Sequence, residues 1–339
     1  MSAYGPRFLI VRLGSLGDVI HGIPVAAALR AHHPDARIDW MVDPAYVELL
    51  SLVPAVDRCV PLNPRASRAA MLETIRELRR RRYAVAFDLQ GLIKSAVLAR
   101  LAGAQRTIGF SKPHLREPLA RLCYTQTVDV PASGHVIGKN LALLTAIGVR
   151  ADAKEFPLAV RRTPVMGIVD KEFDGHGYAV MNMGAAWPNK RWPPERFGAL
   201  AAALRDRLGI RSLVLWGPGE EPIASAVAAA SSGAAAVAPA TTITDVAVIM
   251  ASAKLVVSGD TGPLHIAAAV GAPIVGLFGP TSAERNGPWS PHDIVVSRFD
   301  RCSCSYQRTC SAGARCIDSI AVSEVAAAAE RRLGLAPQP

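Results

Sequence analysis

The segment at 258–265, Ser-Gly-Asp-Thr-Gly-Pro-Leu-His, combines residue types that suit a sugar attached to a phosphate. It follows an apolar run and precedes an Ala-rich segment, which predicts a buried strand, a tight turn and a helix. The first turn of such a helix offers backbone N–H groups and the positive end of its dipole to a phosphate. Asp260 adds an acceptor for a sugar hydroxyl, and the same turn carries Thr261, Gly262 and His265. The pattern predicts a sugar-nucleotide pocket, although capping of the helix by Asp260 or Thr261 explains this segment equally well on its own.

Two further segments carry charged residues directly after predicted strands. Residues 184–193 hold Lys190 and a neighbouring arginine between two tryptophans. Lys190 can neutralise charge on a departing nucleotide, unless the segment is a surface loop anchored by its tryptophans. Residues 216–221, Trp-Gly-Pro-Gly-Glu-Glu, present Glu220 and Glu221. Either acid can accept two ribose hydroxyls or simply occupy a helix N-terminus.

Near the N-terminus, Arg-Leu-Gly-Ser-Leu-Gly-Asp at 12–18 forms a glycine-containing turn between the first predicted strand and helix. A carboxylate at Asp18 would be stabilised by the helix dipole and could accept a proton from an attacking hydroxyl. Helix capping is the simpler role for Asp18 on this observation alone. The turn lacks the Gly-x-Gly-x-x-Gly pattern of dinucleotide-binding folds, which argues against an NAD-dependent oxidoreductase.

The N-terminal half carries most of the positive charge of this chain. Residues 1–160 hold 21 Lys and Arg against 13 Asp and Glu, a net +8, and the remaining residues hold 17 against 15, a net +2. An anionic partner is therefore expected at the first half. The candidate contacts are Lys94, Arg116, Arg65 and Arg68. Nucleic acid is not expected, because the chain has neither a helix-turn-helix pattern nor a basic surface interleaved with aromatics.

Four of the six cysteines cluster at Cys302, Cys304, Cys310 and Cys316. Their spacing departs from the paired C-x2-C layout of zinc sites, although four thiolates could hold zinc. We favour reduced thiols, because the chain lacks a signal-peptide layout and any apolar run of transmembrane length, and is expected in the cytoplasm. No acid pair suited to a nucleotide-bound metal stands out, so neither a metal nor a cofactor is expected.

Short apolar runs alternate with helical segments along the chain, which predicts an α/β protein with parallel sheets. The expected strands are 8–13, 38–42, 58–62, 83–89, 107–110, 179–183, 212–216, 235–238, 255–258, 274–278 and 294–296. The expected helices are 19–31, 44–52, 68–82, 94–101, 136–147, 194–208, 222–230, 244–251 and 262–270. The alternation restarts after a proline-containing passage, so we expect two doubly wound domains, 1–160 and 161–339. Ligands of such sheets bind outside the carboxyl ends of the strands, where the motifs above lie.

Taken in order, these segments resemble glycosyltransferase family 9, the bacterial ADP-heptose:lipopolysaccharide heptosyltransferases, with the closer likeness to its heptosyltransferase I branch. The likeness runs through residues 8–11, 14–18, 90–95, 116–118 and 260–265. It implies a GT-B fold, in which two Rossmann-like domains face each other across a cleft. It also implies an inverting transfer of heptose that needs no metal.

Site roles follow from this resemblance. Asp18 would match the base that deprotonates the acceptor hydroxyl, Lys190 the lysine on the donor phosphates, and Asp260 the acid that meets the heptose. The phosphate pocket would be lined by Thr261, Gly262 and His265, and the ribose would be held by Glu220 or Glu221.

The implied partners are ADP-heptose and Kdo-modified lipid A, whose carboxylates and phosphates fit the basic half. Lys94 and Arg116 would bind Kdo, with Arg65 and Arg68 in a similar loop setting. The resemblance also implies a cytoplasmic protein that is peripheral at the inner face of the inner membrane. The cysteine cluster lies outside the family pattern. It leaves open a relative with the same fold but another sugar or a later inner-core acceptor, as in heptosyltransferase II.

Overall fold

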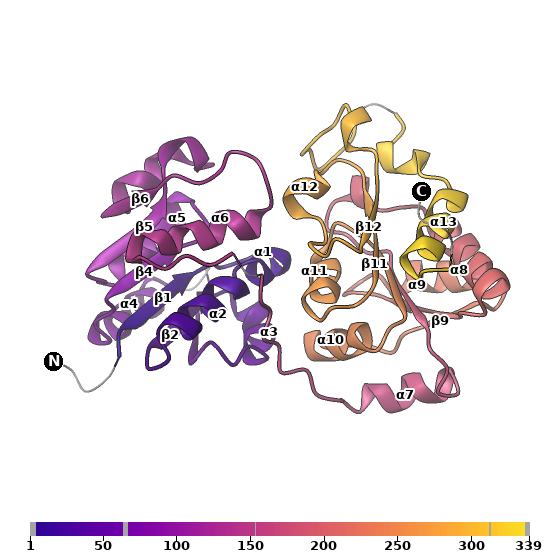
Figure 1. The fold of residues 1–339 in the computed structure, drawn as a ribbon, viewed down its shortest axis with the longest axis horizontal. Coiled ribbons are helices and arrows are strands. Elements are labelled where there is room, and N and C mark those ends of the chain that lie inside the picture. The colour runs from indigo at the N-terminus through magenta and orange to yellow at the C-terminus, as the bar shows by residue number, and fades with distance from the viewer. Residues whose placement is uncertain (1–4, 64–66, 153, 312, 336–339) are drawn as a thin grey trace. The chain divides into compact units, whose positions relative to one another are not determined.

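The computed structural model describes residues 5–63, 67–152, 154–311 and 313–335. The chain divides into two compact units, Met1–Ala159 and Val160–Pro339, each with a six-stranded parallel sheet (Figure 1). Among the described residues, no helix has both the length and the apolar character needed to cross a membrane.

The sheet of the first unit has the strand order β3-β2-β1-β4-β5-β6. Its strands are β1 (Arg7–Val11), β2 (Arg37–Val42), β3 (Arg58–Pro61), β4 (Val85–Asp88), β5 (Arg106–Phe110) and β6 (Gln126–Val128). Its helices are α1 (Leu16–Ile20), α2 (Ile23–His32), α3 (Val47–Ser51), α4 (Arg68–Arg80), α5 (Ile93–Leu101) and α6 (Val136–Ala142). Short 3-10 helices are η1 (Pro44–Tyr46), η2 (Lys112–His114), η3 (Pro118–Cys123) and η4 (Leu143–Ile147). The strand order reverses between β1 and β4, the position at which doubly wound sheets bind ligands.

The second unit repeats this arrangement with the order β12-β11-β10-β7-β8-β9. Its strands are β7 (Ala179–Asn182), β8 (Ser212–Leu215), β9 (Ala235–Val237), β10 (Leu255–Gly259), β11 (Ile274–Phe278) and β12 (Ile294–Ser297). Its helices are α7 (Val165–Glu172), α8 (Pro194–Leu208), α9 (Glu221–Ala229), α10 (Ile243–Ala251), α11 (Gly262–Ala269), α12 (Ala283–Asn286) and α13 (Val322–Arg332). Its 3-10 helices are η5 (Pro188–Lys190), η6 (Phe299–Arg301) and η7 (Cys316–Ser319). Here the order reverses between β7 and β10.

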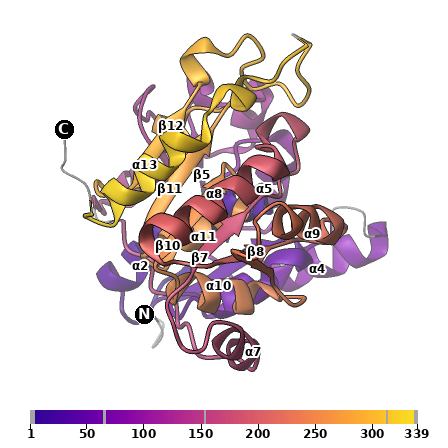
Figure 2. The ribbon, with the colours of Figure 1, turned by 90° about the vertical axis from the view of Figure 1, so that its right-hand side faces the viewer.

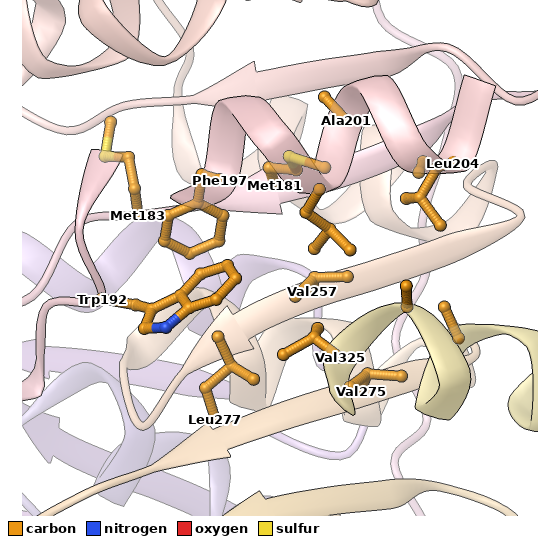
Figure 3. Packing of buried hydrophobic residues seen from close by; sticks show 14 of the residues in the cluster. Met181, Met183, Trp192, Phe197, Ala201, Leu204, Val257, Val275, Leu277 and Val325 are labelled. Atoms are coloured by element: carbon orange, nitrogen blue, oxygen red, sulfur yellow. The ribbon is translucent and has the colours of Figure 1, made fainter. Parts of the chain in front are cut away.

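Buried side chains fix each sheet against its helices. In the first unit, Leu9 and Val11 alternate along β1 and join a core cluster with residues of α4 and α5. In the second, α8 lies beside both α9 and α13 over one face of the sheet (Figure 2). Figure 3 shows the core beneath them, where Trp192 and Phe197 pack edge to face with ring centroids 5.0 Å apart. Trp192 also donates its indole N–H to the carbonyl of Ile320 at 3.0 Å, which ties the loop after β7 to the segment before α13.

The predicted α/β class with two doubly wound sheets is confirmed, and the differences lie in individual elements. The single helix expected at 19–31 is two helices, because Pro24 at the start of α2 has no N–H with which to continue the helix from α1. Strand β6 was not predicted, since it has only three residues and two of them are polar. Helices α7 and α13 were not predicted either.

Candidate functional site

Three neighbouring strands of the second unit bring the predicted donor-binding residues to one edge of its sheet. Lys190 follows β7, Glu220 follows β8 and Asp260 follows β10. These strands are adjacent and parallel in the order β10-β7-β8, so their carboxyl ends lie at the same edge. Two of the three loops flank the reversal of strand order between β10 and β7, where a nucleotide is expected to bind.

Lys190 and Asp260 form a buried ion pair at this edge. Lys190 Nζ lies 2.6 Å from Asp260 Oδ2, and the lysine and aspartate side chains are 15% and 6% exposed. His265 Nε2 lies 3.4 Å from the other oxygen, Asp260 Oδ1. Burial opposes ionisation of Asp260, but the His265 hydrogen bond and the Lys190 charge outweigh it and hold the pKa of Asp260 well below its usual range. The carboxylate therefore stays charged and is fixed between the Lys190 ammonium and the His265 ring.

Lys190 is further positioned by its own loop. Its ammonium lies 4.5 Å from the centre of the Trp187 ring, a cation–π distance. A Cβ on Gly259 would stand 3.1 Å from the Lys190 carbonyl oxygen, a tight contact, so glycine lets β10 and this loop approach each other closely. An ammonium has three N–H donors, so Lys190 can bond to Asp260 and still donate a hydrogen bond to a phosphate oxygen.

A side chain of β7, and not a side-chain helix cap, holds the turn into α11 in place. Thr261 is the N-cap residue, but its side chain does not cap the helix. Its hydroxyl accepts a hydrogen bond from Asn182 Nδ2 at 2.9 Å, and Asn182 also donates to Ser258 Oγ at 2.9 Å. Thr261 therefore occupies the N-cap position that the capping alternative allowed, but without a capping hydrogen bond from its side chain, and Asp260 is not the N-cap residue. Gly262 begins α11, at the end whose dipole favours an anion.

The structure separates the two candidate ribose acids. Glu220 Oε2 accepts the Gly217 N–H at 3.0 Å, and its Oε1 lies 3.7 Å from Arg191 Nη2. A Cβ on Gly184 would overlap the Glu220 carboxylate, so this glycine is required to admit it. Glu221 is the exposed first residue of α9. Glu220 is thus the acid at the sheet edge.

In the first unit, Asp18 lies at the start of α1, which follows β1. Ser15 donates its backbone N–H and its hydroxyl to Asp18 Oδ2 at 3.1 and 3.0 Å, so Asp18 does cap this helix. Arg12 Nη2 lies 2.5 Å from Asp18 Oδ1, and Arg12 Nη1 donates to the Leu89 carbonyl at 2.5 Å. The Asp18 side chain remains 32% exposed, so a hydroxyl can reach a carboxylate that three donors hold in place.

The loop after β4 lies at the same carboxyl edge of the first sheet as the turn after β1, because these two strands are parallel neighbours. Gln90 Oε1 accepts the Leu13 N–H at 3.0 Å, which joins it to the turn before Asp18. Asp88 is fully buried and accepts hydrogen bonds from Tyr124 at 2.7 Å and from Ser95 and the Gln90 N–H at 2.9 Å. Burial raises the pKa of Asp88, although these hydrogen bonds act in the opposite direction.

The predicted acceptor-binding cations are exposed. The first residue of α5 donates its N–H to Glu117 at 2.7 Å, which brings the segments of Lys94 and Arg116 together. Arg68 is exposed at the start of α4, which follows β3, the edge strand two places from β1. Arg65 lies outside the described residues.

The clustered cysteines are arranged as two thiol pairs, Cys304 with Cys310 and Cys302 with Cys316. Within the described part of the chain, no group of three or more His, Cys, Asp or Glu side chains is placed to hold a metal ion.

Several site residues were not singled out from the sequence. Asn182 and Asp88 are polar residues that end otherwise apolar strands, which is the signal that could have identified them. Arg12 is a cation directly after β1. Tyr124 carries no such signal, because it reaches Asp88 only through the fold.

The chain is similar to known proteins over most of its length. The model of glycosyltransferase family 9 (heptosyltransferase) matches residues 71–315. The chain is 30% identical over 318 residues to lipopolysaccharide heptosyltransferase 1 of Pseudomonas aeruginosa, covering 90% of this chain and 87% of that protein. The structure of Escherichia coli heptosyltransferase WaaC with ADP matches with a TM-score of 0.79 and 26% identity, covering 96% of this chain and 99% of that one. The structure of WaaC with ADP-2-deoxy-2-fluoro heptose has a TM-score of 0.74 at 26% identity, with coverages of 94% and 97%.

Proposed function

Because the chain belongs to glycosyltransferase family 9 and is a heptosyltransferase of lipopolysaccharide biosynthesis, we propose that it transfers heptose from ADP-heptose to a Kdo hydroxyl of inner-core lipopolysaccharide. The transfer inverts the anomeric carbon and uses no metal. The observation that carries the donor assignment is the Lys190–Asp260 pair at the reversal of strand order in the second unit.

The donor-binding residues have separate roles in this proposal. Lys190 and the first turn of α11, at Thr261 and Gly262, bind the phosphates, and Glu220 accepts the ribose hydroxyls. Asp260 meets the heptose with its remaining lone pairs while it holds Lys190, and His265 positions Asp260. The relative WaaC has been solved with ADP and with a fluorinated ADP-heptose, which supports a nucleotide donor of this type.

Asp18 is the proposed base. Its carboxylate takes the proton of the acceptor hydroxyl as that oxygen attacks the anomeric carbon from the face opposite the ADP. The bond between that carbon and the phosphate oxygen breaks, and ADP leaves with the electron pair. Lys190 stabilises the charge that develops on the leaving phosphate, as a metal ion does in other transferases.

The acceptor is bound by the basic first unit in this proposal. Lys94 and Arg116 contact the Kdo carboxylates, and Arg65 and Arg68 contribute further positive charge. Guanidinium groups suit such anions, because their planar fork binds two oxygens at once.

An apolar surface among these cations supports contact with a lipid membrane. Ile93 and Val97 on α5 are 41% and 38% exposed, and Leu119 and Leu122 on the neighbouring η3 are 65% and 75% exposed. Exposed apolar side chains flanked by Lys and Arg bind anionic membrane surfaces. We infer a peripheral position at the cytoplasmic face of the inner membrane. The double variant Leu119→Glu, Leu122→Glu should lose binding to anionic vesicles, and retained binding would refute the inference.

The experiment that tests the function is ADP release by the purified full chain from ADP-heptose, with and without Kdo2-lipid A and with EDTA. Release that depends on the acceptor and persists in EDTA is expected. ADP binding without acceptor-dependent release would refute the Kdo acceptor and direct the search to another sugar or a later inner-core acceptor. Loss of release in EDTA would refute the metal-independent mechanism.

A further inference from the structure

The two cysteine pairs contain none of the residues that the proposed function assigns to the donor or the acceptor. Cys304 Sγ lies 2.8 Å from Cys310 Sγ, and Cys302 Sγ lies 2.9 Å from Cys316 Sγ. All of these cysteines are thiols in the structure. Since the sulfurs of a disulfide are about 2.05 Å apart, each pair needs only a small movement to form one.

The two pairs differ in reactivity. The hydrogen bond from Cys310 lowers the pKa of Cys304 to about 7, against the effect of burial, and the Ser303 and Ser311 hydroxyls contribute. Burial and the neighbouring Cys302 raise the pKa of Cys316 to about 12. Only the thiolate is a nucleophile, so Cys304 is more reactive than Cys316 at neutral pH.

The Cys304–Cys310 pair encloses residues 305–309, and this segment contacts the 187–192 loop that carries Lys190. Asn189, which is buried beside Lys190 in η5, donates its side-chain amide to the Gln307 carbonyl at 2.6 Å. Gln307 lies between Cys304 and Cys310 in the chain. A second bond to the same loop comes from outside the 304–310 segment: Arg315, which follows Cys310 in the chain, donates its Nη1 to the Pro188 carbonyl at 3.0 Å.

We propose that Cys304 and Cys310 are an oxidation site at which a peroxide closes a disulfide, and that the closed ring restrains the segment supporting the Lys190 loop. The Cys304 thiolate attacks a peroxide oxygen, the O–O bond breaks, and the departing hydroxide takes a proton to become water. Cys310 then attacks the sulfenic sulfur of Cys304, the S–O bond breaks, and a second water leaves with the Cys310 proton. Two thiols lose two electrons, and the peroxide gains them. Cys304 is only 2% exposed, which favours hydrogen peroxide over bulkier oxidants.

The test treats the reduced full chain with hydrogen peroxide and maps its peptides by mass spectrometry. The expected product has lost two hydrogen atoms and joins Cys304 to Cys310, while Cys59, whose pKa is raised by burial, stays alkylatable. Hydrogen exchange at 187–192 and 304–310 should slow by about threefold or more in the oxidised form. Neither readout requires the transferase activity, so failure here is separate from failure of the proposed function.

Matched variants distinguish this pair from its neighbours. Cys310→Ser should stop at a sulfenic acid on Cys304 that a dimedone probe traps, whereas Cys302→Ser should still form the Cys304–Cys310 disulfide. Exclusive oxidation of Cys302 and Cys316, or no disulfide in the wild type, would overturn the proposed site. A disulfide that leaves exchange at 187–192 unchanged would overturn the proposed restraint.

Discussion

Lys190 Nζ lies 2.6 Å from Asp260 Oδ2, so the cation proposed for the donor phosphates is held by the acid proposed for the heptose. The two residues are 70 positions apart in the chain and meet because β7 and β10 are neighbours. Each residue therefore influences the binding role of the other, so substitutions of Lys190 and of Asp260 are needed to separate their contributions.

Replacing Lys190 tests its contact with the donor phosphates. Lys190→Met should raise the Kd for ADP by about 10- to 100-fold, because a hydrogen bond from a charged group contributes about 1.5–3 kcal/mol. Lys190→Arg, which keeps the charge, should lose less affinity. Titration calorimetry measures both values, and an unchanged Kd in the methionine variant would remove Lys190 from the donor site.

Asp260 should make stability depend on pH. Its pKa in the folded protein is lowered below the ordinary value of 3.8, so its stabilising effect is fully present above that value and is lost as the pH falls towards the folded pKa. At pH 7, Asp260→Asn should lower the free energy of unfolding by about 3 kcal/mol, because it breaks a buried ion pair. Urea unfolding of wild type and variant should show this difference narrowing below pH ~4. A difference that stays constant between pH 7 and 3 contradicts the assignment.

Glu220 and Glu221 provide a matched pair. Glu220→Gln should raise the KM for ADP-heptose by about tenfold, because ribose hydroxyls bind a carboxylate more strongly than an amide. Glu221→Gln should leave that KM within about twofold, since Glu221 is exposed. Steady-state kinetics at saturating acceptor measures both. Equal effects of the two variants would show that the Glu220 geometry has no part in donor binding.

Asp18 caps α1 and is also the proposed base, and two variants distinguish the roles. Asp18→Asn keeps an oxygen that can accept the Ser15 N–H, so the helix should remain capped while kcat falls by about 100- to 10,000-fold. ADP affinity should not change. Ser15→Ala removes a capping hydroxyl and keeps the carboxylate, so its kcat should stay close to wild type. Similar losses of kcat in both variants would reduce Asp18 to a structural residue.

Lys94 and Arg116 should affect the acceptor and not the donor. Lys94→Ala and Arg116→Ala should each raise the KM for Kdo2-lipid A by about tenfold, with the KM for ADP-heptose nearly constant. Arg207→Ala, on α8 of the second unit, is the control, since that arginine pairs with Glu330 at the surface. A larger effect on the donor KM would relocate the acceptor site.

The sequence was sufficient for most of the fold because the strands are apolar on both faces. Runs such as 274–278 are buried throughout, so they can be identified as strands from their apolar residues without knowledge of the neighbouring strands. β6 differs because its three residues pair only at the edge of the sheet, where burial does not select apolar side chains.

Less of the candidate site than of the fold could be predicted from the sequence, because the site depends on strand order. The sequence identified Lys190 and Asp260 as separate candidates, but their pairing follows from the neighbouring positions of β7 and β10. It could not separate Glu220 from Glu221, since the difference lies in the space that Gly184 leaves. The capping role of Asp18 was foreseen, whereas its ion pair with Arg12 required the folded turn.

Both units have the same strand order, and each has its own reversal point. The candidate residues for the sugar nucleotide come from the second unit and those for the lipid from the first. The proposed assignment implies modular inheritance: mutations that retarget the acceptor could accumulate in the first unit, Met1–Ala159, while nucleotide recognition is inherited unchanged in the second. A chimera that joins the second unit to the first unit of a relative should therefore take its acceptor preference from that relative.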